Sequence, residues 1–159
     1  MTKAILDPAS RHHPGQRATR GFTLIEMMIV VVVIGILASI AIPNFLNMKF
    51  RAQEAAVRKN AHVTRLAAED FSVQNDGVYA ANIGSALPSG NTLLDLLPEG
   101  ALLVNPFSNA ADSPINGIAA NPGVVGYLSL DTNADGSPDG YSISGFGASA
   151  LIVTYTNGI

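Results

Sequence analysis

The sequence of 159 residues contains no cysteine, which excludes disulfide bonds, a thiol nucleophile and cysteine metal sites. Basic residues are missing from most of the chain, because neither Lys nor Arg occurs after Arg65. The same stretch holds nine acidic residues, so a basic nucleic-acid-binding surface there is excluded on electrostatic grounds. His62 is the one histidine outside the first 20 residues. Catalytic bases are therefore scarce, and we predict that the chain is not an enzyme.

One long apolar run begins at Phe22 and ends at Ile42, interrupted by Thr23, Glu26 and Ser39. About 20 residues at 1.5 Å each cover a hydrocarbon core of about 30 Å. The run therefore predicts a transmembrane or filament-core helix over residues 22–43. A chain of this length then has room for one small soluble domain.

A polar, basic segment, residues 1–21, precedes the apolar run. Positively charged flanks stay on the cytoplasmic side, so this segment is predicted to be a leader peptide. A secretory peptidase acting after Ala41, in the small-residue triplet 39–41, is the alternative cleavage. The length of the apolar run and the carboxylate of Glu26 argue against it.

Residues 44–76 continue the helix in amphipathic form. Pro43 removes one backbone donor and predicts a bend without ending the helix. Beyond it, apolar residues recur at steps near 3.6 and predict one buried face. The sequence Asn75-Asp76-Gly77 predicts the end of the helix, because Gly adopts the left-handed conformation readily. The recurring apolar residues are Ala52, Ala56, Val63, Ala67 and Phe71.

Beyond Gly77 the composition shifts to Gly, Pro, Asn and Ser with short apolar runs. These runs have strand length and β-branched or aromatic content, whereas residues 105–123, with three prolines, are predicted to form a long loop. We predict an α+β fold in which residues 77–159 form a head with a small antiparallel sheet on the amphipathic half-helix. The expected strands are residues 101–104, 124–130, 141–146 and 151–155.

The sequence Arg20-Gly21-Phe22-Thr23-Leu24-Ile25-Glu26, followed by the apolar run and Pro43, closely resembles the type IV pilin and pseudopilin family. The resemblance implies a pilin-like fold and a prepilin peptidase that cleaves between Gly21 and Phe22 and methylates the new Phe22 amine. It also implies an inner-membrane assembly platform with an ATPase that packs the mature chain into a helical homopolymer. The expected locations are the inner membrane before assembly and an extracellular pilus or a periplasmic pseudopilus afterwards.

Glu26 is the anomaly within the apolar run. A lone ionised carboxylate at bilayer depth costs about 3 kcal/mol on insertion scales, and such residues are functional by default. The amine freed at Phe22 lies about 6 Å away along the helix axis, and a neighbouring subunit presents the same amine. We therefore hypothesise that Glu26 pairs with the Phe22 amine of another chain and sets the offset between subunits. The alternative is that Glu26 merely lies at headgroup level, where a carboxylate costs little.

The sequence DTNADGSPDG, residues 131–140, is acidic and rich in turn residues. Oxygen ligands at alternate positions followed by Gly match the first half of an EF-hand-like calcium loop, although Ser142 stands where that loop has a bidentate Glu. The alternative is a solvated hairpin loop in which Asp and Asn cap their own turns. We predict a Ca²⁺ site that serves as a staple in place of a disulfide bond. Its side-chain ligands are Asp131, Asn133, Asp135 and Asp139.

Three functions remain in competition after these steps. The first is a structural subunit of a type IV pilus-like filament. The second is a calcium-binding major pseudopilin of a type II secretion system, which drives periplasmic protein export; the lack of cysteine and the acidic loop favour it. The third, from a different class, is a membrane-anchored extracytoplasmic binding module that uses the acidic loop.

Overall fold

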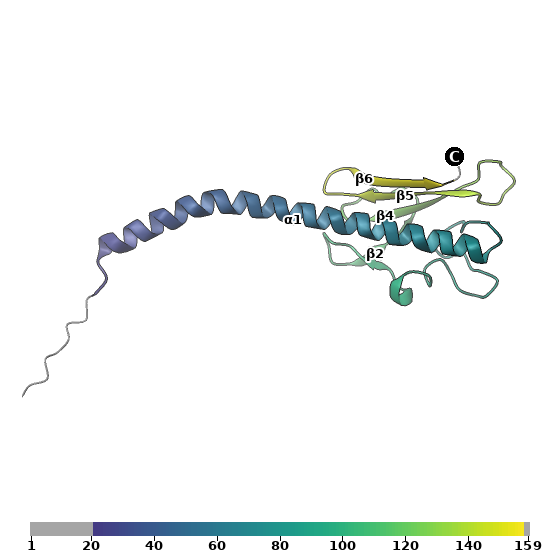
Figure 1. Ribbon diagram of the computed structural model, residues 1–159, viewed down its shortest axis with the longest axis horizontal. Coiled ribbons are helices and arrows are strands. Elements are labelled where there is room, and N and C mark those ends of the chain that lie inside the picture. Colours follow the sequence, from purple (N-terminus) through teal and green to yellow (C-terminus); the bar gives the residue numbers. More distant parts are fainter. Residues whose placement is uncertain (1–20, 158–159) are drawn as a thin grey trace, which may run out of the picture. The chain divides into compact units, whose positions relative to one another are not determined.

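The computed structural model describes residues 21–157. The chain divides into two compact units, the first ending at Ala41 and the second comprising Ile42–Ile159. One long helix, a single 3-10 turn and short strands make up the described part, which confirms the predicted α+β class (Figure 1). The elements are α1 (Leu24–Gln74), η1 (Pro98–Gly100), β1 (Leu103–Val104), β2 (Ala111–Ser113), β3 (Ile115–Asn116), β4 (Val125–Leu130), β5 (Gly140–Phe146) and β6 (Leu151–Asn157).

Helix α1 continues through Pro43 and ends close to where the sequence predicted. The Gly77 N–H donates to the Ser72 carbonyl at 2.9 Å, and Asp76 has φ 53°. A residue in the left-handed region followed by this wide hydrogen bond is the Schellman ending of a helix. The left-handed position that closes the helix is therefore occupied by Asp76, while Gly77, at φ 90°, follows it.

The buried face of α1 lies slightly to one side of the predicted stripe. Ala67 and Phe71 are buried, as predicted, but Ala52 is exposed. Because the head covers the helix along one face only, the buried positions are displaced by about one residue at the start of the contact. They are Val57, Ala61, Thr64, Ala67, Ala68, Phe71 and Ser72.

The main sheet has the strand order β3-β4-β5-β6, and β4, β5 and β6 lie along the C-terminal part of α1 (Figure 1). The pairs β4–β5 and β5–β6 are antiparallel, as predicted. Strand β3 pairs with β4 in parallel, and a separate antiparallel pair joins β1 to β2. The sheet is therefore mixed, and the long loop predicted over 105–123 contains two short strands, β2 and β3.

Two residues explain why the segment 105–123 folds. Asn105 is 2% exposed; its amide donates to the Pro122 carbonyl at 2.9 Å, and its side-chain oxygen accepts from the Phe107 N–H at 2.8 Å. A Cβ on Gly126 would lie 2.2 Å from the Gly117 carbonyl oxygen. Only glycine therefore lets the strand β3 and the residues after it approach β4 this closely.

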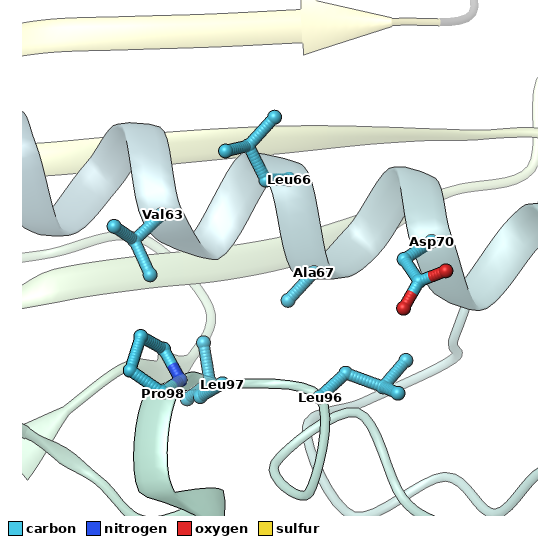
Figure 2. Close-up of a pocket in the computed structure, with 7 residues that line it drawn as sticks. All are labelled: Val63, Leu66, Ala67, Asp70, Leu96, Leu97 and Pro98. Atoms are coloured by element: carbon cyan, nitrogen blue, oxygen red, sulfur yellow. The ribbon is translucent and has the colours of Figure 1, made fainter.

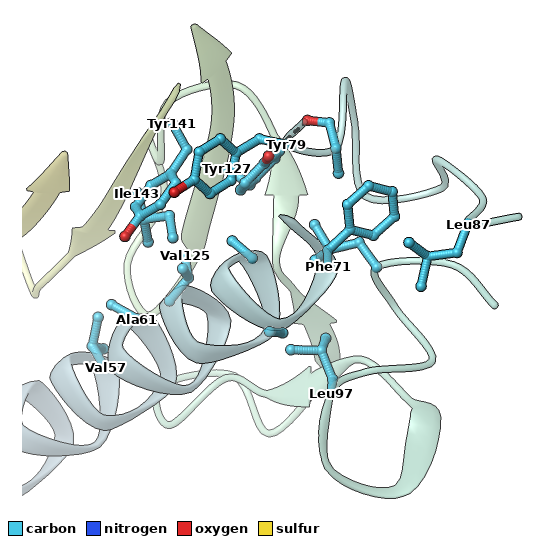
Figure 3. Packing of buried hydrophobic residues seen from close by; sticks show 14 residues of the cluster. Val57, Ala61, Phe71, Tyr79, Leu87, Leu97, Val125, Tyr127, Tyr141 and Ile143 are labelled. Carbon is cyan, nitrogen blue, oxygen red and sulfur yellow. Dashed lines mark hydrogen bonds between the residues drawn. The ribbon is translucent and has the colours of Figure 1, made fainter. Parts of the chain in front are cut away.

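The core of the second unit lies between α1 and the sheet, and it is rich in aromatic rings (Figure 3). Tyr127 and Tyr141 are stacked with centroids 6.5 Å apart, and Tyr79 meets Tyr141 edge-on at 5.2 Å. The Tyr127 hydroxyl donates to the Ala80 carbonyl at 2.6 Å, so burial leaves no unpaired hydroxyl there.

Candidate functional site

Thr23 and Glu26 close the N-terminus of α1 through reciprocal hydrogen bonds. The N–H and the hydroxyl of Thr23 both donate to Glu26 Oε2 at 2.9 Å, and the Glu26 N–H donates to Thr23 Oγ1 at 3.2 Å. Thr followed three residues later by Glu is a capping box, which satisfies two otherwise unpaired donors of the first turn. Sequence reasoning missed this role of Glu26, although the spacing of the two residues carries the signal.

The carboxylate of Glu26 keeps one oxygen available. Both donated bonds from Thr23 go to Oε2, and within residues 21–157 no hydrogen bond reaches Oε1. The side chain is exposed. A second cationic donor can therefore approach Oε1 without disturbing the helix cap.

The first unit presents an apolar surface with nothing of its own chain to cover it. Every residue from 22 to 41 is exposed except Ala38, which is half-buried; Leu24 is 82% exposed and Phe22 is 77% exposed. The helix is long and apolar enough to cross a membrane, with a mean hydropathy of 2.8 over its most apolar window. An exposed apolar surface of this extent marks contact with a membrane or with protein.

Gly21 and Phe22 precede α1, and both are exposed. The remainder of the predicted leader, residues 1–20, lies outside the described residues. Cleavage and methylation at the Gly21–Phe22 bond therefore stay predictions. Pro43 lies within α1, and the bend predicted there also stays a prediction.

The acidic loop connects β4 to β5, and its carboxylates accept hydrogen bonds from the loop itself. Asp131 accepts from the Gly136 N–H at 2.8 Å, and Asp139 accepts from the Thr132 N–H at 2.8 Å. The hydroxyl and N–H of Thr132 hold the pKa of Asp139 below its usual range. This arrangement matches the hairpin loop of Asx turns that was the alternative to calcium.

Calcium binding at the four predicted ligands stays a prediction. Asp135 accepts from the Ser137 N–H at 2.7 Å and from the Asn133 amide at 3.0 Å. In the part of the chain that the structure describes, no three acidic or His side chains gather as a metal-binding group. A cation at Asp131, Asn133, Asp135 and Asp139 would share carboxylates that already accept these hydrogen bonds, and each carboxylate keeps further lone pairs.

A polar cluster that sequence reasoning missed ties α1 to the sheet. The Tyr141 hydroxyl donates to Glu69 Oε1 at 2.6 Å, and the Tyr79 hydroxyl donates to Glu69 Oε2 at 3.0 Å. The Asn157 amide in turn donates to the Tyr79 hydroxyl. Burial, followed by the Glu69 hydrogen bond, raises the pKa of both Tyr79 and Tyr141. The cluster joins the helix, the chain after it and the last two strands without a covalent bond.

A groove of about 410 Å³ lies beside α1, between the helix and the chain that leads into η1 (Figure 2). Its walls are apolar apart from Asp70, the one ionisable side chain among the lining residues. A single carboxylate supplies no acid–base pair. The lining residues are Val63, Leu66, Ala67, Asp70, Leu96, Leu97 and Pro98.

Residues 16–42 match the family model described as the prokaryotic N-terminal methylation motif. The chain is 43% identical to the type IV major pilin protein PilA of Myxococcus xanthus over 84 residues, which are 52% of this chain and 37% of that protein. It is 40% identical to a probable minor fimbrial protein of Dichelobacter nodosus over 107 residues, covering 67% of this chain and 60% of the relative.

A third relative is the type IV narrow pilus major component of Thermus thermophilus, 40% identical over 73 residues, which are 46% of this chain and 63% of that protein. The matches span about 37 to 63% of the length of these relatives. No solved structure matches the chain.

These relatives are pilins and fimbrial proteins by name, in agreement with the prediction that the chain is not an enzyme. The matched motif includes Gly21, Phe22 and Glu26, the residues that carry the resemblance in the sequence. By this N-terminal segment, the chain is similar to the type IV pilins, and its fold of one long helix and a small sheet is consistent with that similarity.

Proposed function

We propose that this chain is a structural subunit of a type IV pilus-like filament. It enters the inner membrane as a prepilin through the apolar part of α1, and a prepilin peptidase cleaves it after Gly21 and methylates the Phe22 amine. An inner-membrane assembly platform with an ATPase then extracts the mature chain and adds it to a helical homopolymer. The filament extends outside the cell.

The observation that carries this proposal is the contrast between α1 residues 24–41 and the rest of the chain. These side chains are exposed almost without exception, and each Å² of apolar surface removed from water contributes about 25 cal/mol. Lipid covers this surface before assembly. Apolar helices of neighbouring subunits cover it in the filament, with Gly35 and Ala38 small enough for close approach.

Glu26 supplies the register in this proposal. Its Oε1 is available while Oε2 holds the helix cap, so one carboxylate serves its own helix and the Phe22 amine of a neighbour together. Either charge alone is costly in an apolar core, whereas the two attract strongly there. The pairing therefore favours one axial offset between subunits over others.

The names of the relatives favour a pilus over a pseudopilus, since each is called a pilin, a fimbrial protein or a pilus component. The pseudopilin alternative rests on the lack of cysteine and on the acidic loop, whose carboxylates accept hydrogen bonds from the loop itself. We therefore place the mature chain in an extracellular filament rather than in a periplasmic one.

The test is electron microscopy of material sheared from the cell surface, together with mass spectrometry of its main protein. The proposal expects filaments built of a chain that begins at methylated Phe22. A chain that begins at Ile42 would mean secretory cleavage. A mature chain that remains monomeric in the membrane while the assembly machine is present would indicate a binding module instead.

A further inference from the structure

Charge is divided between the two ends of the second unit. Near the start of the second unit, four exposed basic residues lie on α1, and Glu54 is the single carboxylate among them. Arg65, farther along, is half-buried and lies over the Tyr155 ring at 5.1 Å, so it does not belong to this exposed set. We call the four cations the basic band: Lys49, Arg51, Arg58 and Lys59.

The opposite end of the unit is acidic. The Tyr79 N–H donates to the Pro138 carbonyl at 2.9 Å, which ties the chain that follows α1 to the β4–β5 loop. The aspartates of both segments therefore lie at one end of the head (Figure 1). No Lys or Arg follows Arg65 to neutralise them. We call this set the acidic tip: Asp76, Asp131, Asp135 and Asp139.

The basic band and the acidic tip cannot neutralise each other within one chain. At 1.5 Å per residue, Lys59 and Lys49 lie about 22 and 38 Å from the last helical residue, Gln74. The Debye length at physiological salt is about 8 Å. Within residues 21–157, no ion pair joins a basic side chain to a carboxylate.

We propose that the basic band of one copy of the chain binds the acidic tip of a second copy. The inference rests on the proposed function, in which all copies leave the membrane in the same orientation. Two such copies bring tip and band together when one is displaced by about 22 to 38 Å along the helix axis. Because the two patches differ, the contact is heterologous and propagates as an open helical array rather than closing into a dimer.

Exposed apolar side chains accompany both patches. Val73, one turn before the acidic tip, is 81% exposed, and Met48, next to the basic band, is 61% exposed. They are 25 residues apart on one helix, which is about 38 Å and falls within the same displacement. Each patch therefore has an exposed apolar side chain beside it, at a spacing that matches the proposed displacement.

The test is charge reversal in the full-length chain, with filament yield measured in sheared surface material. The band variant combines Arg51→Glu with Lys59→Glu, and we expect its yield to fall at least about tenfold because like charges then face each other. The defect should shrink at raised salt, which screens the repulsion. The matched control is Glu99→Lys, outside both patches, with an expected yield within about twofold of the unmodified chain.

The decisive variant adds Asp76→Lys and Asp135→Lys to the band variant. The repulsion is then removed, and we expect at least about half of the lost yield to return. Tyrosine fluorescence and the amount of subunit in the membrane show that each variant is folded and inserted. A band variant with normal yield, or a combined variant that is folded yet not restored, would overturn the pairing. An unmodified chain that forms no filament at all would instead overturn the proposed function.

Discussion

The two halves of α1 have similar helical structure but opposite relations to their surroundings. From Leu24 to Ala41 every residue except the half-buried Ala38 is exposed. From Val57 to Ser72 one face is buried against the head, with Val57 and Ala61 fully inaccessible. The first half therefore depends on other molecules for its burial, whereas the second half completes the core of its own chain. Changes in the first half should affect assembly, and changes in the second half should affect folding.

The largest expected effect is on assembly and comes from Glu26. Glu26→Ala removes the ion pair that we propose between subunits; losing such a pair in an apolar core costs about 3 to 5 kcal/mol, so filament yield should fall by about a hundredfold or more. Cleavage after Gly21 and the unfolding of the head should change little. Quantitative electron microscopy of sheared material measures the yield, and normal filaments from this variant would remove the hypothesis.

Glu26→Gln separates the two roles of this side chain. The amide oxygen can still accept from Thr23 in the helix cap, but the charge is gone. We expect filament yield to be low here as well, since the charge is what meets the amine. Full yield from Glu26→Gln together with low yield from Glu26→Ala would mean that the cap alone matters.

The next effect is on folding and compares Phe71 with Ile29. Phe71→Ala should lower the free energy of unfolding of the head by about 3 to 5 kcal/mol, because it leaves a cavity between α1 and the sheet. Ile29→Ala, in the exposed half, should change it by less than about 0.5 kcal/mol. Denaturant unfolding in detergent can be followed by tyrosine fluorescence, since all four tyrosines lie in residues 79–155. Equal destabilisation by both substitutions would contradict the comparison.

A smaller effect comes from the polar cluster around Glu69, which joins α1 to β5. Tyr141→Phe removes one of the two hydroxyls that donate to Glu69, and we expect a loss of about 1 to 3 kcal/mol. Tyr155→Phe is the control, because the Tyr155 hydroxyl has no hydrogen-bond partner within residues 21–157. The same unfolding assay measures both variants. If Tyr155→Phe lowered the free energy of unfolding as much as Tyr141→Phe does, the hydrogen bond to Glu69 would contribute nothing specific.

The two tyrosines of this polar cluster predict how the stability of the head depends on pH. Burial raises the pKa of Tyr79 and Tyr141 above the ordinary value, so above about pH 10 the unfolded chain binds fewer protons than the folded one. The contribution to stability is fully present below that pH and is lost as the pH rises toward the raised pKa. Unfolding measured between neutral and alkaline pH should show this decline, with a shallower slope in Tyr141→Phe. Unchanged stability across that pH range would contradict the raised pKa of these two tyrosines.

The last prediction concerns calcium at Asp131, Asn133, Asp135 and Asp139. A staple that binds the folded state alone adds about 2.7 kcal/mol at a hundredfold excess over its dissociation constant. EGTA should then lower the melting temperature of the head. An unchanged midpoint would mean that the hydrogen bonds of the loop hold it without an ion.

The features of the sequence that depend on local pattern predicted the structure well. The apolar run and the stop at Asp76-Gly77 each act within a few residues, so α1 begins and ends within two residues of expectation. Strands β4, β5 and β6 follow from short β-branched and aromatic runs. The processing motif is equally local, which is why the family was recognisable from residues 20–43.

Features that depend on distant contacts were not predictable in the same way. The parallel pairing of β3 depends on the close backbone approach at Gly126 and on the buried hydrogen bonds of Asn105. The local sequence around these two residues does not indicate either role. The hydrogen bond from Tyr141 to Glu69 joins residues that are 72 positions apart in the sequence. The stripe on α1 was placed slightly off because its centre is set by the head that covers it, not by the helix alone.

High-resolution electron microscopy of the native filament tests the central claim most directly. The account predicts that the first ordered residue is Phe22, that the apolar half of α1 is buried among neighbouring subunits, and that Glu26 lies within about 4 Å of the Phe22 amine of another chain. A filament in which Glu26 faces solvent, or in which the apolar half of α1 stays uncovered, would contradict it.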